Sequence, residues 1–91
     1  MQTVYKYRLE VQPVQIVKLP LKRVLTIQIQ DGTPCLWALV DTDVPAMPLT
    51  IHMAGTGIQD GNDYERLKYT NTTQYGAFVF HWFYEPMKGV M

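Results

Sequence analysis

The chain has 91 residues, enough for one domain and too few for two. Eight Lys and Arg balance eight Asp and Glu, and the resulting zero net charge disfavours a general binder of nucleic acid. The single cysteine excludes an internal disulfide. No apolar run approaches the ~20 residues of a membrane span, and residues 1–6 lack the plan of a signal peptide. We therefore expect a cytoplasmic protein without a membrane partner.

Alternation of polar and apolar residues with a period of two dominates the chain, which indicates β-strands rather than helices. Residues 3–9 and 14–19 give the first two predicted strands. Pro13 and Pro20 bracket the second one, as is typical of a strand at the edge of a sheet.

Residues 22–30 form the clearest half-buried strand, and the side chains expected to face the core are Leu25, Ile27 and Ile29. Asp31-Gly32 then supplies the residues that a tight hairpin needs at positive φ. Residues 34–41 return as the partner strand. Because that strand is apolar on both faces, we expect it to be covered on both.

Three further segments complete the chain. Residues 49–54 form a strand, and residues 64–73 form either a strand or a short helical turn followed by a strand. Residues 77–85 form the last strand, which Pro86 ends. The sequence therefore predicts an all-β fold, a small antiparallel sandwich or barrel of about six or seven strands with room for one short helical turn. We expect one β domain over residues 1–86 and a C-terminal extension over residues 87–91.

No catalytic signature is present, and we expect no enzyme activity. Gly55-Thr56-Gly57 invites an anion-binding interpretation because paired glycines let backbone N–H groups approach a phosphate, although a role in a turn is more ordinary. His52 and His81 lie in strands and lack the spacing of metal ligands. Cys35 has no visible activating base. We expect neither a metal nor a cofactor.

The last strand is apolar on both faces, although a thin domain has only one core to fill. One explanation is that a loop covers the second face. The other is a subunit interface, where aromatic residues are enriched. We expect a homo-oligomer whose interface residues are Phe78, Phe80, Trp82 and Tyr84.

Four blocks of this sequence resemble a family of short proteins of unknown function that is common in phage and actinobacterial genomes. They are residues 5–9 (YKYRL), 27–41 (IQIQDGTPCLWALVD), 55–57 (GTG) and 76–81 (GAFVFH). The chain departs from the family after the glycines, where Ile58-Gln59 replaces a frequent His-Pro. The resemblance implies a phage or prophage origin.

By analogy with small β-rich phage proteins, we expect a phage-encoded protein that sequesters a nucleotide-derived immune messenger, a cyclic nucleotide or an ADP-ribose derivative, without cleaving it. Such binding would inhibit bacterial anti-phage defence. Two alternatives stay open. The first is a protein inhibitor of a host defence enzyme, and the second is a phage accessory or structural protein with no ligand.

A nucleotide-sized ligand needs a pocket of about 300–1,000 Å³, which a single thin core cannot hollow out, so we expect the ligand between subunits. Its base would stack on aromatic rings, and its phosphates would meet cations or backbone amides. The expected ligand-binding residues are Tyr5, Lys6, Tyr7, Arg8, Arg23, Trp37, His52, Gly55, Thr56, Gly57, His81 and Trp82.

Overall fold

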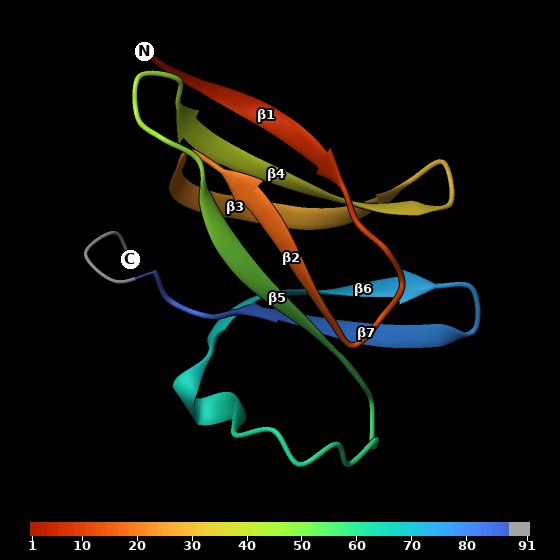
Figure 1. Cartoon of the computed structure of the whole chain (residues 1–91). Helices are drawn as coiled ribbons and strands as arrows, with labels where there is room; N and C mark the ends of the chain where they lie inside the picture. Colours follow the sequence, from red (N-terminus) through yellow and green to blue (C-terminus); the bar gives the residue numbers. More distant parts are fainter. Residues whose placement is uncertain (88–91) are drawn as a thin grey trace.

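The structure, a computed structural model, describes residues 1–87 and consists of seven strands and one short 3-10 helix (Figure 1). The strands are β1 (Gln2–Arg8), β2 (Val14–Leu19), β3 (Leu21–Gln30), β4 (Thr33–Asp41), β5 (Met47–Gly55), β6 (Lys68–Tyr75) and β7 (Phe78–Tyr84). The helix η1 (Tyr64–Arg66) precedes β6, as the alternative of a helical turn followed by a strand predicts. Within the described residues, no helix is long and apolar enough to cross a membrane.

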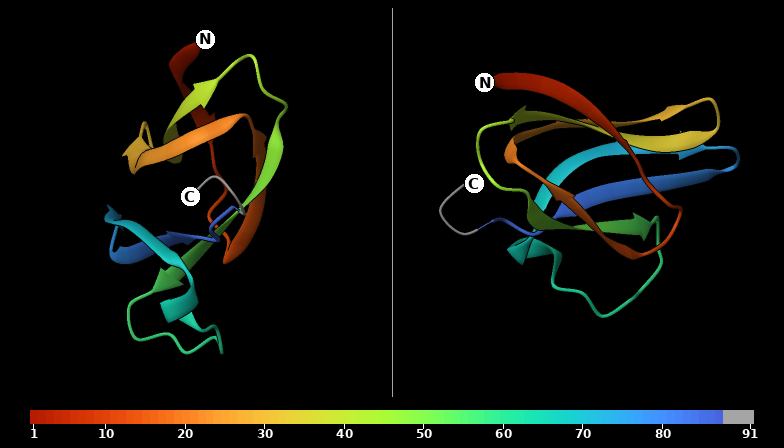
Figure 2. Two further views of the ribbon diagram at one scale, coloured as in Figure 1. Left: turned by 90° about the vertical axis from the view of Figure 1, so that its left-hand side faces the viewer. Right: turned by 45° about the horizontal axis from the view of Figure 1, so that its top comes forward.

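The strands form two antiparallel sheets packed face to face, with dimensions of 40 × 30 × 16 Å (Figures 1 and 2). The first sheet has the order β1-β4-β3 and the second the order β2-β5-β7-β6. The predicted all-β antiparallel fold is confirmed, and the two-sheet arrangement is a sandwich. The prediction that β2 is an edge strand is also confirmed.

The core lies between the two sheets and follows from the alternation in the strands. Every second residue of β4 faces it, and β5 and β7 contribute the opposite wall. Each fully buried large side chain contributes about 1.5–3 kcal/mol relative to exposure. The largest fully buried side chains are Trp82, Leu19, Ile27, Leu36, Leu49, Ile51 and Val40.

Trp82 and Tyr84, two of the four predicted interface residues, belong to this core. Trp82 is 0% exposed, and its Nε1 donates a hydrogen bond to Thr73 Oγ1 at 2.9 Å. Burial raises the pKa of the Tyr84 hydroxyl. Of the four predicted interface residues, only Phe78 and Phe80 reach the surface, because β7 leaves the core towards its N-terminal end.

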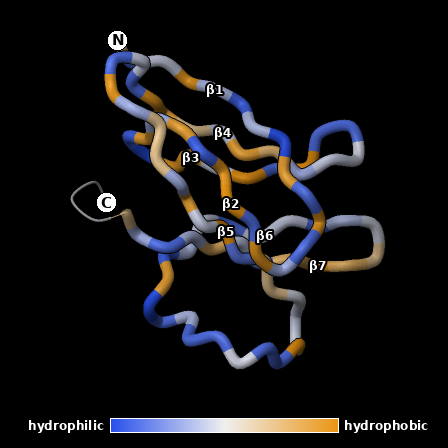
Figure 3. The backbone as a smooth tube through the Cα atoms, viewed as in Figure 1, coloured by the Kyte–Doolittle hydropathy of each residue, from blue (hydrophilic) through white to orange (hydrophobic). Residues whose placement is uncertain are grey.

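Two hairpins lie at the same end of the sandwich (Figure 1). Asp31 and Gly32 connect β3 to β4 with φ of 51° and 76°, the two positive values of a type I′ turn, as predicted. Gly76 and Ala77 connect β6 to β7, and only Gly76 has positive φ, at 60°. The tip of the first hairpin is hydrophilic, whereas the start of β7 is hydrophobic (Figure 3).

A bulge in β3 changes the faces that alternation predicts for that strand. The register between β3 and β4 shifts between Val24 and Thr26, so Leu25 is the extra residue. Leu25 is exposed, and the prediction that it faces the core is wrong, whereas Ile27 is buried as predicted. An extra residue in a strand turns the following side chains by one step.

Asn71 joins the two sheets along the side where β3 and β6 are neighbours. It lies directly after a bulge in β6, and its Oδ1 accepts a hydrogen bond from Ile27 N at 2.9 Å. Its Nδ2 donates to Ile27 O at 2.5 Å. The amide side chain thus pairs with the edge of β3 as a neighbouring peptide group would, and it satisfies two backbone groups that β6 does not reach.

The outer faces of the two sheets differ in their cover. Residues 56–67, the covering segment, pass over the outer face of the second sheet, drawn in green to cyan in Figure 1. There the Tyr64 ring packs on Phe83 with 4.8 Å between centroids, and the Tyr64 hydroxyl bonds to Asp60. Tyr64 thereby lowers the pKa of the Asp60 carboxyl. The second apolar face of β7 is therefore covered by a loop at Phe83, whereas Val79 towards its N-terminal end is exposed.

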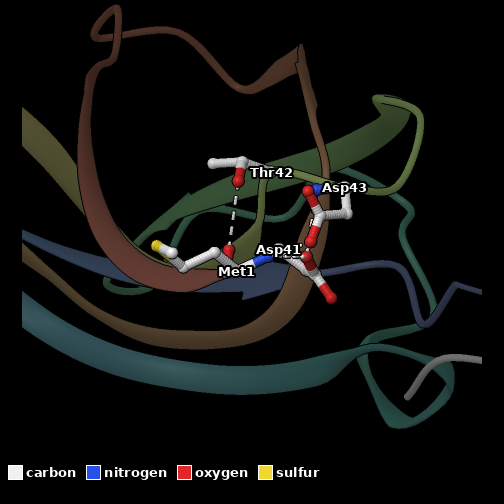
Figure 4. A network of polar contacts seen from close by, with 4 residues as sticks. All are labelled: Met1, Asp41, Thr42 and Asp43. Carbon is white, nitrogen blue, oxygen red and sulfur yellow. Dashed lines mark hydrogen bonds and ion pairs between the residues drawn. The ribbon is translucent and has the colours of Figure 1, made fainter.

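The N-terminal end of β1 is tied to the end of β4 by a polar network (Figure 4). The Met1 amino group lies 2.8 Å from Asp41 Oδ1 and also contacts Asp43. Thr42 N donates to Met1 O at 2.9 Å. At the other end of the chain, Met87 packs against the core. The remainder of the predicted C-terminal extension, residues 88–91, lies outside the described residues.

Candidate binding groove

A surface depression of about 600 Å³ opens between the β6–β7 hairpin, the turn after β5 and the connection between β1 and β2. Its walls are mainly apolar and aromatic. The residues that line it are Val11, Gly55, Thr56, Ile58, Tyr75, Ala77, Phe78, Val79 and Phe80. This volume lies within the about 300–1,000 Å³ of small-molecule sites, and it occurs in one subunit as a surface depression.

The β6–β7 hairpin supplies the aromatic rings of the groove. Its two-residue turn places Tyr75 opposite Phe78, and Phe80 follows two residues later on the same face of β7. The Phe78 and Phe80 rings stack at 6.1 Å with 9° between their planes. The Tyr75 ring lies 6.2 Å from Phe80. Phe78 is 64% exposed, so the rings form a platform open to solvent.

The turn after β5 supplies the facing wall. Ile58 N donates to Gly55 O at 3.1 Å, and Gly57 takes a φ of 78°. A Cβ on Gly55 would lie 3.0 Å from the Ile58 side chain, so glycine allows Ile58 to fold back against the strand. Thr56 N donates to Val79 O at 3.4 Å. Because these two amides are already bonded within the protein, the geometry favours a turn over an anion-binding loop.

A second, polar depression of about 400 Å³ adjoins the first, and Val11 and Tyr75 line both. Arg8 and Glu10 supply its charges, and the Gly32-Thr33 end of the first hairpin closes it. The Glu10 backbone is held at both its N–H and its carbonyl by the Gln15 side chain, at 2.9 and 2.8 Å. Together the two depressions form one continuous site with an aromatic half and a polar half, and we call this site the groove.

His81 stands behind the groove and orients Thr56. Its Nε2 lies 2.7 Å from Thr56 Oγ1, and its Nδ1 lies 2.9 Å from Thr72 Oγ1. Tyr69 extends this chain with a 2.7 Å contact between its hydroxyl and Thr72 Oγ1. Both ring nitrogens of His81 are therefore occupied, and the side chain that reaches the groove is Thr56.

His52 lies away from the groove, beneath the other end of the covering segment. It is 6% exposed, and its Nε2 lies 2.9 Å from Glu85 Oε2. Its Nδ1 is buried without a partner among residues 1–87. A polar cavity of about 280 Å³, lined in part by Asn62, Asp63 and Arg66, adjoins the pair. Because Nε2 of His52 is bonded to Glu85 and Nδ1 is enclosed, the ring can orient the Glu85 carboxylate but does not offer a nitrogen to a ligand.

The cations predicted to bind phosphate lie mostly on the uncovered outer face of the first sheet. Lys6 is paired with Trp37 across β1 and β4, and Arg23 with Leu39 across β3 and β4. Lys6 Nζ bonds to Gln30 Oε1 at 2.7 Å. Arg8 is the exception, because it also lines the polar half of the groove.

The structure thus divides the predicted ligand-binding residues among separate places. Gly55, Thr56 and Arg8 line the groove, and His81 supports it. The other eight do not line it: Tyr5, Lys6, Tyr7, Arg23, Trp37, His52, Gly57 and Trp82. Burial raises the pKa of Tyr7, which packs against the core.

Several groove residues escaped prediction as ligand contacts. Tyr75 was detectable in principle, because a two-residue turn at Gly76 and Ala77 places it opposite Phe78. Val11 and Ile58 come from connections distant in sequence, and no local pattern marks them. Within the described residues, no three His, Cys, Asp or Glu side chains are grouped to hold a metal ion.

Comparison with known proteins identifies the family but no activity. The family model for a domain of unknown function (DUF7352) matches residues 1–90. The chain belongs to this family. The DUF7352 match includes residues 87–90 of the predicted extension. Neither the curated proteins nor the solved structures contain a match to this chain.

Proposed function

We propose that this DUF7352 protein is a non-catalytic binding protein that holds a nucleotide-like molecule in the groove. The observation that carries the proposal is the direct junction of an aromatic half with a polar half containing Arg8. A nucleotide has the same division, since its base is a flat ring and its phosphate an anion. Tyr75 and Val11, which line both halves, would lie beneath the sugar.

The aromatic half suits a heterocyclic base. Base–aromatic stacking contributes about 1–3 kcal/mol per base, and it requires an accessible ring face. Phe78 presents such a face, because most of its side chain is in contact with solvent. Thr56 adds a hydroxyl at the edge of an otherwise apolar wall, which can form a hydrogen bond with one edge of the base.

The polar half suits an anionic group together with a hydroxyl. A guanidinium binds phosphate with two parallel hydrogen bonds, and Arg8 forms no ion pair within residues 1–87. Glu10 provides an acceptor for a ribose hydroxyl and disfavours ligands that bring many negative charges. We therefore propose a ligand with one base and few phosphates, such as an ADP-ribose derivative or a cyclic nucleotide.

The wider role that we propose is sequestration of a nucleotide-derived immune messenger by a phage protein in the cytoplasm of its host. Binding without turnover would withdraw the messenger from bacterial anti-phage defence. The family resemblance supports the phage setting, and the groove supports the ligand class. A host defence enzyme as the direct partner remains the alternative, and it predicts no response to any small ligand.

A thermal-shift titration with ADP-ribose and cyclic nucleotides tests the proposal. A ligand at 100 times its Kd adds about 2.7 kcal/mol of stability. We expect Phe78→Ser and Arg8→Gln each to raise the apparent Kd from this titration at least tenfold, and so to reduce the thermal shift at a given ligand concentration. The matched controls are Tyr5→Ser and Arg23→Gln, which alter an exposed ring and a cation outside the groove. Equal losses in variants and controls would contradict the assignment.

One observation favours hydrolysis as a second candidate function. Thr56 Oγ1 lies within hydrogen-bond distance of His81 Nε2, and Thr72 contacts the other ring nitrogen, as in a nucleophile–base–orienter arrangement. The neighbouring amides of Thr56 and Ile58 are bonded to carbonyls and do not offer an oxyanion hole. Mass spectrometry of the released ligand separates the two functions, because a binder returns it intact and a hydrolase returns fragments.

A further inference from the structure

The two sheets have four edge strands, and three of these edges are blocked. The edges of β3 and β6 are joined by Asn71. The edge of β1 carries Lys6 and Arg8, and charged side chains are a common protection against edge-to-edge pairing. The edge of β2 has neither form of protection over most of its length.

The direction of the backbone groups in β2 follows from its pairing with β5. Met53 N donates to Pro13 O at 2.9 Å, so residue 13 points its carbonyl towards β5. N–H and C=O groups alternate in direction along an antiparallel strand. Val14, Ile16 and Lys18 therefore point theirs away from β5, where no strand of residues 1–87 pairs with them.

The side chains along this edge are apolar as well as exposed. Ile16 is 65% exposed, and Val14 is also largely in solvent. An edge that combines free backbone groups with exposed β-branched side chains is a template for strand addition. Lys18 is its only charged residue, so a partner strand must avoid placing a cation opposite it.

We propose that β2 pairs antiparallel with β2 of a second copy about a two-fold axis, joining the two four-stranded sheets into one of eight strands. Only the even-numbered residues of β2 have free backbone groups, and these must face each other, so the two-fold axis can pass through any of residues 14–18. The register centred on Ile16 pairs Val14 with Lys18 of the other copy and forms about six backbone hydrogen bonds.

The competing registers are weaker. Centring on Gln15 or Val17 pairs only two of the three free residues with β2 of the other copy. Centring on Lys18 places the two lysines directly opposite each other, which is destabilising. Centring on Val14 leaves Ile16 and Lys18 unpaired with β2. In the register centred on Ile16, pairing ends at Pro20, which has no N–H to donate. The resulting interface is isologous and closed, as a stable dimer requires.

Disulfide trapping tests both the dimer and its register. In the proposed register the two Ile16 Cα atoms are about 5.5 Å apart, within the range of a disulfide. The two Val14 Cα atoms are four residues apart along the strands, about 13 Å. We expect Ile16→Cys to form a crosslinked dimer under mild oxidation, and Val14→Cys and the wild type, whose Cys35 is buried, to stay uncrosslinked. Equal crosslinking at both positions would overturn the register.

Sedimentation velocity supplies the second readout. We expect the wild type to sediment as a dimer of the 10.5 kDa chain, and Ile16→Lys to weaken the dimer at least tenfold by opposing two cations. Ile58→Lys, an equally exposed site in the groove, is the control and should leave the dimer intact. A monomeric wild type, or a dimer that Ile16→Lys leaves unchanged, would overturn the proposal. Ligand binding in the groove is measured separately and does not depend on either result.

Discussion

Asn71 holds together two strands that share no backbone ladder. Both of its contacts are to the partly buried Ile27 peptide groups, so Asn71→Ala leaves a donor and an acceptor unpaired. Such a loss costs about 1–3 kcal/mol. For a domain of this size that corresponds to a fall in Tm of roughly 4–8 °C per kcal/mol, measurable by calorimetry.

Asn71→Asp separates the hydrogen-bond account from a simple loss of packing. A carboxylate accepts from Ile27 N–H but has no proton for Ile27 O, so we expect a loss at neutral pH as large as that of the alanine variant. A protonated carboxyl regains the donor, so part of the stability should return below roughly pH 4. The same loss at both pH values would contradict the bridging role.

Asp41 gives the fold a pH dependence of known sign. The Met1 amino group beside it lowers the pKa of this carboxyl, and the contact raises the pKa of the amino group. The carboxylate's contribution to the free energy of unfolding is complete above pH 3.8, the pKa of this group in the unfolded chain, and is lost as the pH falls. The amino group's contribution to the free energy of unfolding is complete below pH 8.0, the pKa of this group in the unfolded chain, and is lost as the pH rises. The free energy of unfolding, measured by denaturant titration at a series of pH values, should be constant between pH 3.8 and 8.0 and fall on either side. Asp41→Asn should make both declines less steep.

At the scale of elements, the β6–β7 hairpin depends on Gly76. An added Cβ there meets no atom within 4 Å, so the cost of Gly76→Ala comes from its positive φ alone. That cost is about 1–2 kcal/mol. We expect urea denaturation to show this loss with an unchanged slope. Ala77→Ser, next to it in the same turn, should stay within about 0.5 kcal/mol of the wild type.

The strands themselves were largely predictable, because they are short, alternating and bounded by Gly, Pro and Asp. Residues 14–19 match β2, and the Asp31-Gly32 turn matches the observed hairpin. The bulges were not predictable. Whether Leu25 packs inward depends on the register against β4, and that register is set by the tertiary fold rather than by local pattern.

At the scale of the whole molecule, the groove combines segments that no local pattern connects. Val11, Ile58 and Tyr75 come from three connections that the two-sheet topology brings to one end. The sequence predicted that aromatic rings and Arg8 bind a ligand, but none of the rings it assigned to the ligand, Tyr5, Tyr7, Trp37 and Trp82, lines the groove. Trp82 is the clearest example, since its burial depends on how far β7 extends into the sandwich.

The topology also separates two surfaces that the sequence treated as one. The predicted ligand site was expected between subunits and shared Trp82 with the predicted subunit interface on β7, which is an inner strand of its sheet. In the structure, β7 contributes to the groove, whereas the free edge belongs to β2. A variant that abolishes the dimer should therefore retain ligand binding.

Mapping of backbone amide shifts by NMR, with ADP-ribose added to the ¹⁵N-labelled protein, shows whether a nucleotide-like molecule binds in the groove. We expect the largest shifts to cluster at Val11, Thr56, Tyr75 and Phe78, with a smaller set around Arg8 and Thr33 in the polar half. Addition of ribose 5-phosphate, which lacks the base, should move only the polar set. Shifts concentrated around Trp37 on the outer face of the first sheet, or none at millimolar ligand, would contradict binding in the groove.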